Sequence, residues 1–134
     1  MNQRGAISIL GAALVGLTVL LGSTAMGIAS LVLARGEAQL AADAAALAAA
    51  PVTFAPFGTE RTPSEEATFF ADANGARLME CRCDPDPVWR SRVVTVTVSV
   101  ALPWIPVPLV GVTATASAEF DPTVWFRTET PEDG

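Results

Sequence analysis

Thirty consecutive residues, 5–34, carry no charge and lie between Arg4 and Arg35. A helix needs about 20 apolar residues to cross the hydrocarbon core of a bilayer, so this stretch is long enough to span it with some tilt. The alternative is a cleaved secretory signal, whose apolar core is about 7–15 residues long. Because this stretch is about twice that length, we predict a retained transmembrane helix over residues 5–34.

The charges are divided unequally by this stretch. Residues 1–4 carry Arg4 and the free amine, whereas residues 35–134 carry the other seven basic residues and all 14 acidic ones, a net charge of −7. The positive-inside rule therefore predicts a cytoplasmic tail at residues 1–4 and an extracytoplasmic domain after the membrane span. An acidic body is repelled by nucleic acid, so we expect no nucleic-acid partner.

Small side chains gather on one side of the predicted span. At 100° per residue, six small residues fall within about 60° of one another, and bulky residues such as Leu14 lie opposite. These six are Ala12, Gly16, Ser23, Gly27, Ser30 and Ala34. A strip of small residues lets another membrane helix approach closely, which predicts helix–helix assembly. The alternative is an accident of a composition rich in Ala, Gly and Ser.

Residues 35–50 read RGEAQLAADAAALAAA and end at Pro51. Alanine is the best helix former, so we expect the membrane helix to continue outward through residues 35–50. This extension has little apolar area of its own. It must therefore pack against a partner or against the domain that follows.

A small domain is predicted over residues 51–127. Thr62, Pro63 and Glu65 form a capping box with proline at the first helical position, and the helix is expected to end at Asn74 and Gly75. We expect this helix to bury the side chains of Phe69, Phe70 and Ala73.

Strands are indicated at residues 76–83, 93–101 and 112–120. In the last two, apolar side chains alternate with Thr and Ser, which is typical of a sheet with one buried face. The fold class is therefore α+β, with a short helix packed on a small antiparallel β-meander. The acidic tail at residues 128–134 contains Pro131 and is predicted to be disordered.

Few residues suggest chemistry. The chain has no His, the commonest general base near neutral pH, and we expect no enzyme activity, no cofactor and no small-molecule substrate. Cys81 and Cys83 are too few for a structural zinc site, which leaves a local disulfide, an intermolecular disulfide or free thiols. Trp104 and Ile105 lie between prolines. They are a candidate partner contact, or Trp104 closes the end of the core.

The first 50 residues resemble a known family. Residues 3–50, and most specifically Gln39-Leu40-Ala41-Ala42-Asp43-Ala44-Ala45-Ala46-Leu47-Ala48, are similar to the N-terminal segment of TadE/TadG-like Flp pilus-assembly proteins. The remainder, with Ala73-Asn74-Gly75-Ala76-Arg77-Leu78 before a cysteine and a Val/Thr strand, resembles the short actinobacterial TadE-like proteins.

This resemblance implies a pilin-like fold and a minor component or assembly factor of a tight-adherence pilus or secretion apparatus. Its partners would be the membrane and other pilin-like or Tad-apparatus subunits. The alternative is an unrelated single-pass membrane protein whose outer domain binds a ligand or an envelope partner.

The resemblance also implies proteolytic processing between Gly5 and Ala6. In the family pattern a glutamate stands five residues after the cleaved glycine, but here that residue is Leu10. The family also places one cysteine before the second helix and one after it, whereas Cys81 and Cys83 both follow it. We therefore expect inefficient cleavage and a minor role in the fibre.

Overall fold

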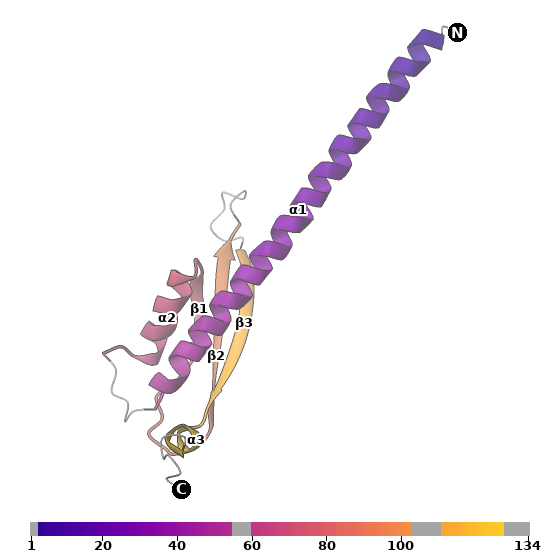
Figure 1. Cartoon of the computed structure of the whole chain (residues 1–134). Coiled ribbons are helices and arrows are strands. Elements are labelled where there is room, and N and C mark those ends of the chain that lie inside the picture. The colour runs from indigo at the N-terminus through magenta and orange to yellow at the C-terminus, as the bar shows by residue number, and fades with distance from the viewer. Residues whose placement is uncertain (1–2, 55–59, 103–110, 128–134) are drawn as a thin grey trace. The chain divides into compact units, whose positions relative to one another are not determined.

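The computed structural model describes residues 3–54, 60–102 and 111–127. The chain divides into two compact units, Met1–Leu33 and Ala34–Gly134. The element order is α1, α2, β1, β2, β3 and α3 (Figure 1). This order confirms the predicted α+β class, with a long apolar N-terminal helix followed by a short helix and an antiparallel sheet.

α1 covers Gln3–Val52 and includes all of the first unit that the structure describes. Over residues 8–29 every side chain is exposed. Four hydroxyl groups between Thr18 and Ser30 donate hydrogen bonds to backbone carbonyls one turn earlier, as with Thr18 to Val15 and Ser23 to Leu20, both 2.9 Å. The other two hydroxyls are those of Thr24 and Ser30. A hydroxyl bonded inside its own helix needs no partner in lipid.

The second unit begins with the alanine-rich part of α1. Seven alanines at helical spacing are almost completely buried there: Ala38, Ala41, Ala42, Ala45, Ala46, Ala49 and Ala50. They share one core with the valines of β2. The predicted extension of the helix is therefore packed against the domain that follows it. The helix ends at Val52 rather than at Ala50, because Pro51 fits within its last turn.

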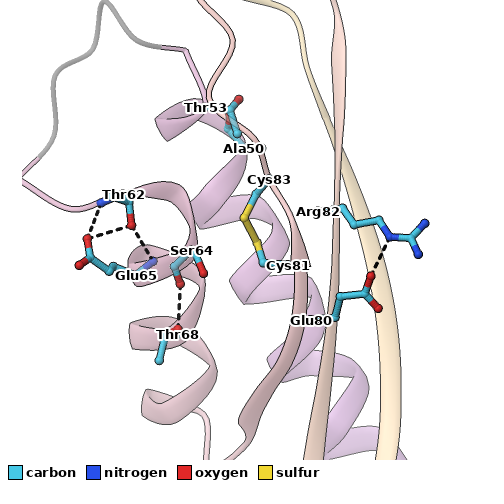
Figure 2. The surroundings of a disulfide bond; sticks show 10 residues. All are labelled: Ala50, Thr53, Thr62, Ser64, Glu65, Thr68, Glu80, Cys81, Arg82 and Cys83. Carbon is cyan, nitrogen blue, oxygen red and sulfur yellow. Dashed lines mark hydrogen bonds and ion pairs between the residues drawn. A yellow bond between two sulfur atoms is a disulfide. The ribbon is translucent and has the colours of Figure 1, made fainter.

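α2 covers Pro63–Ala73 and has the predicted capping box (Figure 2). The Thr62 backbone N–H donates to Oε2 of Glu65 at 2.7 Å, and the Glu65 N–H donates to Oγ1 of Thr62 at 3.3 Å. These hydrogen bonds, led by the one from the Thr62 backbone, lower the pKa of Glu65. After the helix, Gly75 adopts φ 72°, the left-handed conformation that glycine accepts without strain.

The predicted buried side of α2 was wrong. The structure buries Ala67 and Ala71, which lie one turn apart, together with Pro63. Phe69 is 50% exposed, because it is about 200° around the helix from Ala67. Ala73 is also exposed, and only Phe70 is partly buried against the core. Small residues on the packed side let the helix lie close to the core.

The sheet contains β1 (Arg77–Arg82), β2 (Arg92–Ala101) and β3 (Gly111–Phe120) in the order β1-β2-β3, and both pairings are antiparallel. As predicted, the valines of β2 alternate inward, and Val94, Val96 and Val98 are at most 1% exposed. The opposite face is polar, with hydroxyl pairs Thr95–Ser117 and Thr97–Thr115, each 2.9 Å apart. Both helices therefore cover the same face of the meander.

α3, Pro122–Arg127, is a short helix that the sequence analysis did not predict. Asp121 stands before it and accepts hydrogen bonds from the backbone N–H and the hydroxyl of Thr123, at 2.9 and 2.7 Å. These bonds, the hydroxyl first, lower the pKa of Asp121. Pro122 occupies the first helical position, where proline is favourable.

Candidate functional site

The apolar half of α1 is exposed among the residues that the structure describes. α1 contains an 18-residue window with mean hydropathy 2.0, of which no part is buried within the chain, so α1 is long and apolar enough to cross a membrane. A signal sequence near an N-terminus meets the same criterion. The structure thus supports a helix that can span a bilayer.

The six small residues assigned to a packing face do not have equal exposure. Ala12, Gly16, Ser23 and Gly27 are exposed, Ser30 is partly buried, and Ala34 is only 6% exposed, in the second unit. A Cβ added to Gly16 or Gly27 would meet no atom within 4 Å. Within the single chain, these two positions therefore have room for a larger side chain.

Cys81 and Cys83 form a disulfide at the end of β1. This is the local pairing among the three alternatives that the sequence left open. In Figure 2 the disulfide lies on the helix side of β1, whereas Glu80 and Arg82 extend away on the other side. Glu80 accepts a hydrogen bond of 2.8 Å from Nε of Arg82. The disulfide and the ion pair together fix the last residues of this edge strand.

Arg92 joins three segments at the base of the domain. Its guanidinium donates to the backbone carbonyls of Thr53 (3.2 Å), Asp86 and Val88, and lies 5.3 Å from the ring centroid of Phe54. The end of α1 is thereby tied to the β1–β2 loop and to β2. A cavity of about 390 Å³ lies beside this cluster.

The β1–β2 loop is held by Asp86. Its carboxylate accepts hydrogen bonds from the Val88 N–H (3.0 Å) and from the Arg90 guanidinium (3.1 and 2.9 Å). These contacts, with Val88 first, lower the pKa of Asp86. The sequence analysis did not assign Asp86 to any interaction. An acid four residues before an arginine was the one available signal for this ion pair.

A groove of about 660 Å³ lies where α1, β3 and α3 meet in the second unit. It is lined by Leu47, Ala50, Pro51, Glu119, Phe120, Asp121 and Val124. Leu47 is 67% exposed and Val124 is 57% exposed, so apolar surface faces solvent here. The sequence analysis missed this groove, because its residues come from two stretches, 47–51 and 119–124, that are distant in sequence.

The remaining predicted sites give less information. Gly5 and Ala6 lie within α1, so the expected processing site is helical in this structure. Trp104 and Ile105 lie outside the described residues. In the part of the chain that the structure describes, no three His, Cys, Asp or Glu residues are grouped so as to hold a metal ion.

No family model, no curated protein and no solved structure matches the chain. The functional argument therefore rests on the residues and on their arrangement.

Proposed function

We propose that this protein is a pilin-like minor component or assembly factor of a Tad/Flp-type pilus or secretion apparatus. The observation that carries the proposal is α1 itself. The same helix is uncharged and exposed over residues 8–29 and has a buried alanine face from Ala38 to Ala50. Such a helix supplies both a membrane span and a large part of a domain core.

A helix shared in this way suits a structural subunit. Within the second unit, seven buried alanines pack this part of α1 into the same core as the sheet. The exposed half has the small residues Gly16 and Gly27 available for another helix. Membrane helices associate through such close packing, because lipid gives no hydrophobic drive between them.

The finer parts of the proposal concern topology. Arg4 before the span and the acidic domain after it favour a cytoplasmic N-terminus and an extracytoplasmic domain. Leu10, in place of the glutamate expected from the resemblance, favours inefficient cleavage after Gly5. The protein then acts mainly at the membrane or at the fibre tip, where an unpaired terminus stays hydrated.

A gene deletion in the source organism tests the proposal. We expect loss of surface pili or of export through the same apparatus, with restoration by the full-length chain. Tagged full-length protein, purified from membranes, should bring down the assembly ATPase and the inner-membrane platform protein. If the deletion strain keeps normal pili and normal export, the proposal fails, and a separate ligand-binding membrane protein becomes the better account.

A further inference from the structure

β3 is an edge strand whose outer side has no backbone partner among the residues that the structure describes. It lies at the end of the order β1-β2-β3 and pairs only with β2. In an antiparallel pair, alternate residues direct their N–H and C=O groups toward the neighbouring strand. The other residues of β3 therefore present a row of donors and acceptors at the sheet edge.

The two edges of the sheet differ in how well they are protected. β1 has an irregular register between Leu78 and Glu80, exposed charges, and a disulfide at its end. Bulges and charges are common devices against unwanted strand pairing. β3 instead pairs with β2 in one continuous register over ten residues, contains no proline, and has Glu119 as its single charge. The outer edge of β3 is regular enough to accept another strand.

An apolar groove adjoins the end of this edge. Leu47 and Val124 are exposed beside Phe120, and Glu119 and Asp121 are the charged residues of the groove lining. Among the described residues none of the groove lining is basic, and Arg127 adds to the hydrogen bonds from Thr123 in lowering the pKa of Asp121. Farther along the same face of β3, Ala114 is only partly buried. A strand added here would place apolar side chains over an incompletely covered core and basic side chains beside two carboxylates.

We propose that the outer edge of β3 binds an extended basic segment of a different protein by strand addition. Main-chain hydrogen bonds to β3 give affinity in this mode of recognition, and alternate side chains give specificity. The apolar side chains of the bound segment lie toward Leu47 and Val124. Its Lys or Arg side chains lie beside Glu119 and Asp121. This proposal concerns the outer domain alone and does not require the protein to enter a fibre.

The acidic C-terminal segment and a second copy of the sheet are both poor occupants by charge. Residues 128–134 contain Glu129, Glu132 and Asp133 and no base, so the two carboxylates of the groove would repel them. A second copy of β3 would bring only another Glu119. The β1 edge of a second copy is irregular and already pairs Glu80 with Arg82. Charge complementarity therefore indicates a basic segment from another protein.

Synthetic peptides and the full-length chain in lipid nanodiscs provide the test. The probe is an eight-residue peptide that alternates Val with polar residues, two of them Lys. One comparison peptide replaces both Lys residues with Glu, and another has alternate backbone amides N-methylated. We expect the basic peptide alone to slow amide hydrogen exchange across residues 112–119. The N-methylated peptide loses the main-chain hydrogen bonds and should bind at least about tenfold more weakly.

Charge reversal separates this edge from the other one. Glu119→Lys should weaken binding of the basic peptide about fivefold to tenfold, whereas Glu80→Lys on the β1 edge should leave it unchanged. Both side chains are exposed, and unchanged thermal unfolding checks that both variants are folded.

Several results would overturn the proposal. One is that no peptide slows exchange in β3. Another is that the acidic or the N-methylated peptide binds as tightly as the basic one. Without peptide, protection of the β3 amides that point away from β2 also contradicts it. If that protection rises with protein concentration, the edge binds a second copy, and if it is lost on deletion of residues 128–134, the edge binds the chain's own tail.

Discussion

Buried alanines set how closely α1 approaches the sheet. Ala41, Ala42, Ala45 and Ala49 are each 0% exposed, and their methyl groups meet the valines of β2 in one core. A small side chain buries little area by itself. It allows backbone and sheet to come close, however, so that many weak contacts form together.

Overpacking this interface should destabilise the domain. Ala45 is fully buried, and Ala45→Leu adds three carbon atoms to its side chain. We expect this change to lower the free energy of unfolding by about 1–3 kcal/mol. Leu40→Ala on the same helix is the control, because Leu40 is 67% exposed and its change should stay within about 0.5 kcal/mol. Urea unfolding of the full chain in detergent measures both. Equal stability of the two variants would contradict the packed-alanine interface.

Glycine in the exposed half of α1 should matter only in an assembly. Gly27→Leu has open space in the single chain, so folding of the sheet domain should be unchanged. The added side chain should push a neighbouring helix away and reduce co-purification of membrane partners several-fold. Leu14→Ile, on the opposite side of the helix, should have little effect. If both variants associate as well as the wild type does, the small-residue face is an accident of composition.

At the scale of elements, local rules made every helix and strand except α3 predictable. The capping box at Thr62, the stop at Gly75 and the alternation of β2 follow from neighbours in sequence. The buried side of α2 was not predictable in the same way. The two phenylalanines suggested it by hydrophobicity, but the packed line of Ala67 and Ala71 depends on how closely the helix approaches the core.

The candidate functional surfaces also differ in whether the sequence alone could predict them. The apolar span and the small-residue strip were visible in the sequence, because each lies on one element. The Arg92 cluster and the groove beside Leu47 were not, since each joins residues that are distant in sequence. The position of β3 at an edge of the sheet follows from the predicted meander, and the structure adds its continuous ten-residue register with β2.

The α2 cap gives a prediction for pH. The pKa of Glu65 is lowered from its usual value of 4.5, so its charged form is favoured in the folded state. Its contribution to stability is therefore present above the unfolded pKa and is lost as the pH falls through the lower folded pKa. Glu65→Ala should destabilise the domain at pH 7, and the difference from wild type should shrink toward pH 3. Urea unfolding at both values measures it, and a difference that grows at low pH would contradict the cap.

At the scale of the whole molecule, we expect proteolytic processing to determine whether α1 can enter a fibre. Cleavage between Gly5 and Ala6 would remove Arg4, which otherwise costs several kcal/mol to bury among apolar helices without a counter-charge. Leu10 cannot neutralise a new N-terminal amine. We therefore expect sheared pili to contain little of this chain and most of it to start at Met1. Intact mass spectrometry of sheared pili checks this, and abundant chains that start at Ala6 along the fibre would refute the minor role.

The central claim is a single-pass protein whose acidic domain lies outside the cytoplasm. A reporter fused after Gly134 of the full chain, examined in carbonate-washed membranes, tests it most directly. We predict active alkaline phosphatase and a dark green fluorescent protein, both retained in the membrane at full length. The same fusions without residues 5–34 should give the opposite pattern in the soluble fraction. Fluorescent, phosphatase-inactive fusions of the full chain, or release of a shortened fusion from the membrane, would contradict the account.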